Sequence, residues 1–155
     1  MTLTPRWRKV VLTLHVITSV GLLGADLVLL TLGAAGMAGF DPAVVYPATG
    51  LIGLVLFAPL ALVMWVIGVV NAVGTKWGLI RYWWVAVKLV ISTAFLLLVL
   101  IALRPLLLDA LHLGADLPAR QRASLLAAPI VSTTLLAFAT IVSVFKPWGR
   151  RTAAA

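Results

Sequence analysis

The sequence contains no cysteine, so disulfide bonds, thiolate metal ligands and cysteine nucleophiles are all excluded. Charge is also scarce, because only 10% of the residues are charged and only four of them are acidic. The usual hydrolase and nucleotide-binding signatures are missing: there is no Walker-type glycine loop, HExxH, GxSxG or pair of intramembrane carboxylates. The sequence therefore carries no complete catalytic signature, which favours a role without catalysis and leaves an enzymatic one open.

Four long apolar runs make up most of the chain, at residues 10–33, 50–73, 85–103 and 123–145. Each is long enough to cross a bilayer, which takes about 20 mostly apolar residues in a helix. Hydrophobic residues reach 63% of the chain, whereas an ordinary soluble domain holds about 45–50%. Since the connections are short, one compact antiparallel bundle is expected. The sequence predicts an all-α, polytopic membrane protein: a single transmembrane domain over residues 1–155 that forms a four-helix bundle.

Basic residues gather at one end of the predicted helices, which sets the orientation. Nine of the twelve Lys and Arg residues lie there: Arg6, Arg8, Lys9, Lys76, Arg81, Lys88, Lys146, Arg150 and Arg151. Because loops rich in Lys and Arg stay cytoplasmic, both termini are predicted to be cytoplasmic, in a multi-pass protein of the cell inner (plasma) membrane. The net charge of +8 then reflects topology, and nucleic acid is not an expected partner.

Tryptophans follow the same asymmetry as the basic residues. The five at this end are Trp7, Trp77, Trp83, Trp84 and Trp148. An indole ring at the membrane boundary keeps its ring in the apolar zone and its N–H near water. These residues are expected to anchor the cytoplasmic face.

The connections at the opposite end are longer. Residues 33–47 are predicted to form a glycine-rich loop, and residues 104–122 the longest loop, in which residues 105–113 form an interfacial helix. Pro59 and Pro129 fall inside the second and fourth runs, where a proline should kink the helix and free a backbone carbonyl.

Three ionisable residues fall inside the predicted spans: His15, Asp26 and Lys88. Charge buried in hydrocarbon is costly unless it is paired or solvated. His15 and Asp26 are eleven residues apart, which at about 100° per residue brings them within roughly 20° of one helix face, with Ser19 on that face too. Two interpretations stay open. The three residues form a proton relay or ligand site, or Asp26 pairs with Arg104 while His15 binds a local partner.

Lys88 lies at a depth similar to that of His15, on a helix that runs in the same direction, so the two side chains could meet. With Asn71, Thr140 and Ser143 from the other helices, they would form a polar pocket near the cytoplasmic face. The alternative is that Lys88 extends its long side chain to the lipid headgroups.

Two short segments resemble motifs of known membrane families. The segment from His15 to Gly24 resembles an H-x6-W-x-G pattern, with Leu22 in place of the Trp, and the segment Trp83–Leu89 resembles a W-x-x-x-K-L element. These patterns occur in the copper-resistance D-type membrane domain, in the J-type membrane-bound protoporphyrinogen oxidase and in an uncharacterised actinobacterial group of four-span proteins. The chain as a whole looks most like the last group.

The resemblance to the oxidase implies that His15 is a haem ligand and that Lys88 belongs to the same site. The only other histidine, His112, lies in the opposite loop, so His15 would need a non-histidine partner, a five-coordinate iron or a second subunit. No metal site is expected otherwise, because Met37 and Met64 are isolated.

Three functions therefore stay open. The sequence favours a non-catalytic membrane subunit or structural protein that binds partner membrane proteins or its own copies through apolar helix faces. The alternative is a haem-binding or redox membrane protein that uses His15 and Lys88. A further alternative is a small proton-coupled transporter that uses His15, Ser19 and Asp26, which four spans would support best as an oligomer.

Overall fold

The computed structural model describes residues 3–75 and 78–148, and the elements found in this part of the chain are helical. They are α1 (Pro5–Met37), α2 (Pro42–Ile52), η1 (Gly53–Phe57), α3 (Ala58–Val73), α4 (Trp83–Leu97), η2 (Leu98–Leu103), α5 (Arg104–Leu113), η3 (Gly114–Asp116) and α6 (Ala119–Phe145). η1 and η2 are π-helical and η3 is a 3₁₀-turn.

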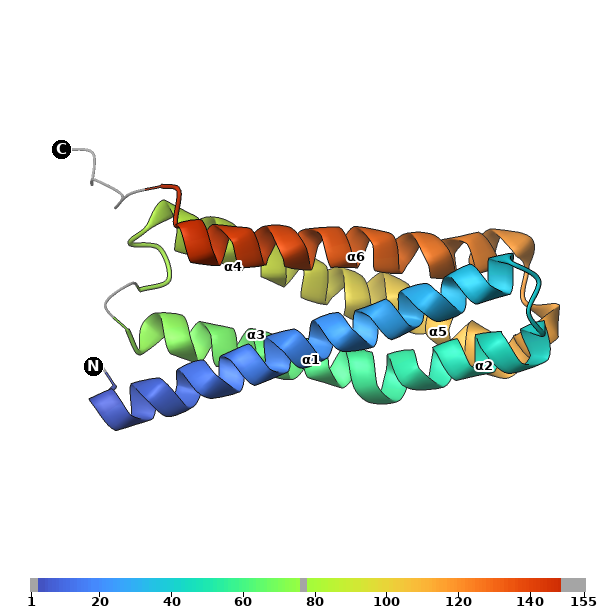
Figure 1. The fold of residues 1–155 in the computed structure, drawn as a ribbon, viewed down its shortest axis with the longest axis horizontal. Coiled ribbons are helices and arrows are strands. Elements are labelled where there is room, and N and C mark those ends of the chain that lie inside the picture. Colours follow the sequence, from blue (N-terminus) through green and yellow to red (C-terminus); the bar gives the residue numbers. More distant parts are fainter. Residues whose placement is uncertain (1–2, 76–77, 149–155) are drawn as a thin grey trace.

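These elements join into four rods, at Pro5–Met37, Pro42–Val73, Trp83–Asp116 and Ala119–Phe145, each long and apolar enough to cross a membrane. Each rod contains one of the four apolar runs of the sequence. The rods lie side by side, and the start of α1 and the end of α6 are at the same end (Figure 1). We call this the proximal end of the bundle and the opposite one the distal end. The predicted all-α four-helix bundle is confirmed.

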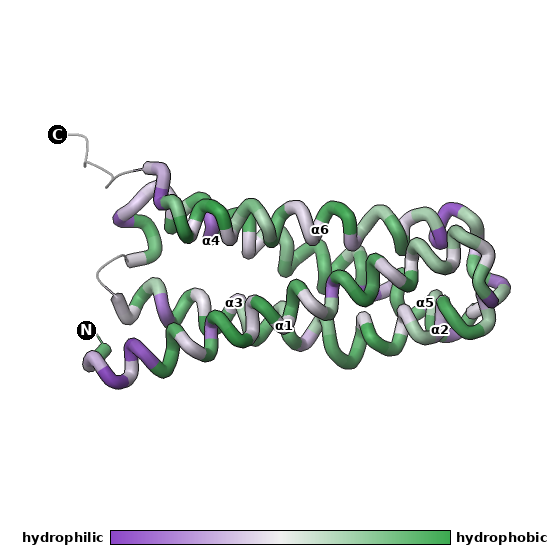
Figure 2. Tube along the Cα trace, in the orientation of Figure 1, coloured by the Kyte–Doolittle hydropathy of each residue, from purple (hydrophilic) through white to green (hydrophobic). Residues whose placement is uncertain are grey.

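The outer surface of the bundle is apolar. Large hydrophobic side chains are exposed on all four rods, among them Val20, Val55, Ile101 and Phe145 at 65–74% of their full accessible area. In Figure 2 the hydrophilic residues gather near the two ends, and the middle of the bundle is mostly hydrophobic. A surface of this kind is solvated by lipid and not by water. The chain is a multi-pass membrane protein.

The described basic residues keep the asymmetry seen in the sequence. Arg6, Arg8 and Lys9 lie in the first turns of α1, and Arg81 and Lys146 flank α4 and α6 at the proximal end. Trp7, Trp83, Trp84 and Trp148 lie at this end as well. Four other residues of the predicted cytoplasmic face lie outside the described residues: Lys76, Trp77, Arg150 and Arg151.

Two prolines of the rods, Pro59 and Pro105, follow π-helical turns, whereas Pro47 and Pro129 lie within the α-helices α2 and α6. The N–H of Ala58 bonds to the Gly53 carbonyl, and the N–H of Arg104 bonds to the Val99 carbonyl, so each bond spans five residues just before Pro59 or Pro105. A proline offers no N–H and its ring crowds the carbonyl four residues earlier. The extra residue per turn lets the rod pass the proline without ending.

The prediction of a glycine-rich loop at residues 33–47 was wrong. α1 continues to Met37 and α2 begins at Pro42, with Asp41 as its N-cap: the Asp41 Oδ1 accepts a hydrogen bond of 2.9 Å from the N–H of Ala43. Gly36 packs against the Tyr46 ring, where an added Cβ would come within 2.9 Å. The glycine permits close helix packing. Composition alone does not distinguish a glycine in a packed helix from a glycine in a loop.

The interfacial helix predicted at residues 105–113 is instead part of the third rod. α5 buries Leu107 and Ala110 and packs against α2. Gly50 permits this contact, because a Cβ at this position would lie 2.5 Å from the Leu107 carbonyl oxygen and 2.6 Å from the Leu111 nitrogen. The second and third rods are therefore tightly packed against each other at the distal end.

The buried apolar side chains form two clusters. One, around Leu22, Phe57, Phe95 and Val99, occupies the middle of the bundle. The other, around Tyr46, Leu107, Leu117 and Leu125, fills the distal end. The proximal part holds a cavity.

Candidate functional site

A cavity of about 590 Å³ lies between α1, α3, α4 and α6 at the proximal end. We call it the proximal cavity. Its polar lining residues are His15, Ser19, Asn71, Thr75, Lys88, Ser92, Thr140, Ser143 and Lys146. Apolar side chains and the rings of Trp65 and Trp84 form the rest of the wall. Mostly apolar cavities of about 300–1,000 Å³ with a few converging polar groups are typical of small-molecule sites.

Lys88 reaches across this cavity from α4 to α6. Its Nζ donates a hydrogen bond to the Oγ of Ser143, which in turn donates to the Ala139 carbonyl at 2.9 Å. The ammonium group is thus directed at a neighbouring helix. An ammonium has three donors, and Ser143 is the one hydrogen-bond acceptor found for it among the described residues.

His15 lies on the facing wall, with its ring against α3. A Cβ at Gly68 would be 3.1 Å from the imidazole Cε1, so the glycine makes room for the ring. The Nδ1 atom is buried and has no hydrogen-bond partner within the described part of the chain. The hydroxyl of Ser19 donates to the His15 carbonyl at 2.7 Å. The structure therefore brings His15, Ser19 and Lys88 to one cavity, together with Asn71, Thr140 and Ser143.

The charged residues that line the proximal cavity in the described part of the chain are both basic. Lys88 and Lys146 both line it, and the Lys146 ammonium lies 5.9 Å from the centroid of the Trp84 ring. None of the described lining residues is acidic. The cavity is an apolar volume with a basic lining at the end where the termini emerge.

Asp26 lies elsewhere, between α1 and α6. It is fully buried, at 0% exposure. Its Oδ1 accepts a hydrogen bond of 2.6 Å from Ser132, and its Oδ2 accepts one of 2.7 Å from Thr133. Arg104, the alternative partner considered for it, is exposed at the start of α5. The polar face of α1 is thus divided: His15 and Ser19 face the proximal cavity, and Asp26 faces two hydroxyl groups.

Sequence reasoning missed Ser132 and Thr133. The signal was present, because a polar pair in the middle of an apolar span needs a partner. In an antiparallel pair of helices, residues at similar distances from the distal end meet. Asp26 and Ser132 meet this condition in α1 and α6.

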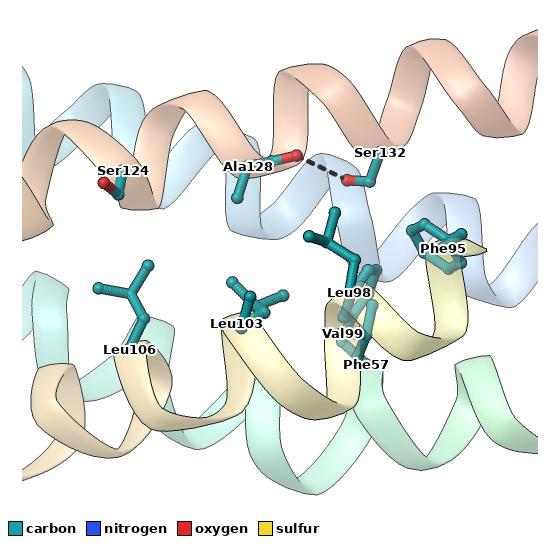
Figure 3. Close-up of a pocket in the computed structure, with 10 residues that line it drawn as sticks. Phe57, Phe95, Leu98, Val99, Leu103, Leu106, Ser124, Ala128 and Ser132 are labelled. Carbon is teal, nitrogen blue, oxygen red and sulfur yellow. Dashed lines mark hydrogen bonds between the residues drawn. The ribbon is translucent and has the colours of Figure 1, made fainter. Parts of the chain in front are cut away.

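A second cavity, of about 350 Å³, lies between α6 and the π-helical part of the third rod. We call it the distal cavity. Ser124, Ala128 and Ser132 line one wall, one on each turn of α6, and face leucines of the third rod (Figure 3). Phe95 lines both cavities, and its ring meets the edge of Phe57 at a centroid distance of 6.1 Å and an angle of 84°.

Within residues 3–75 and 78–148, no three His, Cys, Asp or Glu side chains come together as metal ligands would. The polar side chains of the distal end form hydrogen bonds with other groups of the chain. Gln121 donates to Asp109 at 2.7 Å. Arg122 donates to the carbonyls of Leu117 and Ala115, each at 2.6 Å, and lies 5.2 Å from the Tyr46 ring centroid.

Comparison with protein-family models gives no match for this chain, and comparisons with curated proteins and with solved structures give none either. The resemblance of the two short segments to the copper-resistance and oxidase families receives no support from them. The function has to be argued from the cavities and their residues.

Proposed function

We propose that this protein is a non-catalytic membrane protein whose proximal cavity binds an amphipathic anion, a molecule with a carboxylate or phosphate head and an apolar body. The observation that carries the proposal is the Lys88 ammonium in a cavity whose other walls are mostly apolar. In the same proposal the chain forms one transmembrane domain with both termini on the cytoplasmic side of the plasma membrane.

The charge of the cavity supports an anionic head. A cation within the hydrocarbon region is costly unless it is paired. Lys88 donates to Ser143, a neutral acceptor, and the described lining residues include no carboxylate that would balance it. An acidic ligand head would supply the missing charge and accept the remaining ammonium hydrogens.

The wall of the cavity supports an apolar body. Trp65 is fixed by a hydrogen bond of 3.0 Å from its Nε1 to the Thr93 hydroxyl, and it lines the cavity with Leu89 and Leu136. Such a surface gains free energy from apolar contact at about 25 cal/mol per Å². The basic residues of the proximal end favour access from the cytoplasmic leaflet.

The test uses a fatty acid that carries a nitroxide spin label, because the label quenches the fluorescence of the cavity tryptophans. The protein is reconstituted in nanodiscs of neutral lipid and titrated with the acid and with its methyl ester. Lys88→Met should weaken binding of the acid roughly ten- to hundredfold, since a hydrogen bond to a charged group is worth about 1.5–3 kcal/mol, and should leave the ester unaffected. Lys9→Met, which removes an exposed cation of α1 outside the cavity, is the matched control.

Equal affinity for acid and ester in the wild-type protein would refute the proposal, as would an unchanged affinity in Lys88→Met. Competition separates the two sources of the anionic head. Displacement by an anionic phospholipid, but not by short free carboxylates, identifies a lipid ligand. Displacement by short free carboxylates, but not by an anionic phospholipid, identifies a free amphiphile.

Orientation is tested independently with single cysteines, since the chain has none of its own. Ala38→Cys, in the distal connection between α1 and α2, should react with a membrane-impermeant maleimide added to intact cells. Thr4→Cys, just before α1, should react only after the membrane is permeabilised. The opposite pattern would place the proximal cavity at the outer face.

A haem protein is the second candidate, favoured because His15, Lys88 and Met64 line one cavity. The donor set fits: an imidazole on one helix and a thioether on another are groups that haem iron accepts, and Lys88 would lie in the same site. Haem would supply one-electron redox chemistry there. Purified protein from haem-replete cells should then show a Soret band that shifts on reduction and is lost in His15→Ala. A featureless spectrum would count against this candidate and leave the anion site untouched.

A further inference from the structure

We propose that Asp26 exchanges a proton with water in the distal cavity through the hydroxyl of Ser132, and that Phe95 separates this site from the proximal cavity. The two cavities are then the two halves of one proton pathway across the membrane, interrupted at one phenyl ring.

Asp26 is the buried ionisable group that the anion site does not use. Both of its carboxylate oxygens accept hydrogen bonds from hydroxyls of α6, and neither partner is a cation. On the helices packed against α1, α3 carries no titratable residue, α2 carries Tyr46, and α6 carries Arg120 and Arg122 in its first turn at the distal end. A carboxyl group in such a place needs partners for both of its protonation states.

Ser132 can serve both states. Its Oγ lies 2.6 Å from the Asp26 Oδ1, 3.1 Å from the Ala128 carbonyl oxygen and 3.2 Å from the Pro129 carbonyl oxygen, so one hydroxyl hydrogen has three acceptors. When Asp26 is ionised, Ser132 and Thr133 donate to it. When Asp26 is protonated, its O–H donates to Ser132, whose own hydrogen turns to a carbonyl of α6. Neither state leaves a buried donor or acceptor unpaired.

The same hydroxyl reaches the distal cavity, which Ser132 lines and Asp26 does not. Figure 3 shows Ser124 and Ser132 on one wall of this cavity, with the carbonyl of Ala128 between them. A buried water needs two to four polar partners, and this wall offers them. A hydronium ion there gives its proton to the Ser132 Oγ as the hydroxyl proton of Ser132 moves to the Asp26 Oδ1. One O–H bond on Ser132 breaks as another forms, and water and a neutral carboxyl group remain.

Phe95 forms the barrier on the other side. It is 3% exposed, and its contact with the fully buried Phe57 fixes the ring between the two cavities. Ser92, one turn earlier on α4, already lines the proximal cavity, so a single turn separates the two spaces. An apolar constriction of this kind stops conduction by excluding water.

The test measures proton entry into liposomes that contain a pH-sensitive dye, driven by a valinomycin-mediated potassium diffusion potential. Phe95→Ala should raise the initial rate about tenfold or more over wild type, because it removes the dry barrier. The double variant Phe95→Ala/Asp26→Asn should conduct as fast as Phe95→Ala, because Asp26 lines neither cavity and exchanges protons with the distal one through Ser132. Phe138→Ala, which removes an exposed ring of α6, is the matched control and should leave the rate unchanged.

A Phe95→Ala rate equal to that of Phe138→Ala would overturn the pathway. Lys88→Met in the Phe95→Ala background separates this proposal from the anion site. If this double variant still conducts protons but no longer binds the fatty acid, the proton pathway and the anion site are independent of each other.

A measurement on the wild-type protein covers the case in which Phe95→Ala does not fold. Infrared difference spectra between alkaline and acidic buffer should contain the C=O stretch of a protonated carboxyl group that is absent in Asp26→Asn and shifted in Ser132→Ala. Identical difference spectra for wild type and Asp26→Asn across the whole pH range of the folded protein would refute proton exchange at Asp26.

Discussion

Replacing Gly50 by alanine tests the closest backbone approach in the bundle. An added Cβ would lie 2.5 Å from the Leu107 carbonyl oxygen, 2.6 Å from the Leu111 nitrogen and 2.8 Å from the Leu111 Cβ. Real Cβ contacts are almost never shorter than 3.0 Å. Because two of the three atoms are backbone, no rotamer change relieves the clash, and α2 and α5 must move apart.

That movement would loosen the distal cluster, in which Tyr46 and Leu107 are each 1% exposed. Overpacking typically costs about 1–3 kcal/mol, and a clash with backbone atoms belongs at the upper end. A loss of about 3 kcal/mol corresponds to roughly a hundredfold rise in the unfolded fraction, since each 1.4 kcal/mol is tenfold.

The assay is reversible unfolding in mixed micelles of rising SDS content, followed by far-UV circular dichroism. Gly24→Ala is the control, because a Cβ there meets nothing within 4 Å. Alanine at this exposed helical position should be neutral or should stabilise by about 0.5–1 kcal/mol. Equal unfolding midpoints for Gly50→Ala and Gly24→Ala would refute the close packing of α2 on α5.

Two further substitutions probe the buried polar contacts, and both use the same unfolding assay. Ser132→Ala should lower the free energy of unfolding by about 1–3 kcal/mol, because it leaves a buried oxygen of Asp26 without its donor. Ser124→Ala removes a hydroxyl that donates to the Arg120 carbonyl of its own helix, and it should lower that free energy little. Equal losses in the two variants would contradict the contact between Ser132 and Asp26. Arg122→Leu should lower the free energy of unfolding by about 1–2 kcal/mol, because it removes two hydrogen bonds to carbonyls between α5 and α6. Replacing the exposed Arg120 by leucine should leave stability unchanged. An equally unchanged stability in Arg122→Leu would show that apolar contacts alone hold the distal end.

The sequence predicts the four rods well because membrane solvation is a constraint that composition reveals directly. A segment in hydrocarbon must satisfy its own backbone and present apolar side chains over about 20 residues, so length and hydropathy identify it without knowledge of its neighbours. The wrong predictions concern contacts between rods. Gly36 and Gly50 were assigned to a loop and a helix end, whereas each provides the space for a neighbouring element.

The same distinction applies to the candidate site: the depth of a residue along its helix could be predicted, whereas its hydrogen-bond partners could not. Depth along the helices was sufficient to place His15 and Lys88 at the same level, and both line the proximal cavity. The hydrogen-bond partners of buried polar residues depend on how each helix is rotated about its axis. The single sequence does not set that rotation, so Ser132 and Thr133 were missed as partners of Asp26.

The tight packing of the second rod on the third at the distal end and the proximal cavity have one geometric cause. Gly50 and Gly53 bring the second rod close to the third at the distal end, whereas the proximal parts of the same rods carry bulky Trp65 and Trp84. Rods held close at one end by small residues and kept apart at the other by large ones enclose a space, which residues of the first and fourth rods also line. Gly50→Ala should therefore reduce the affinity for the spin-labelled acid although it lies at the opposite end of the second rod from Lys88. Unchanged binding in a destabilised Gly50→Ala protein would show instead that the cavity is shaped locally, by the residues that line it.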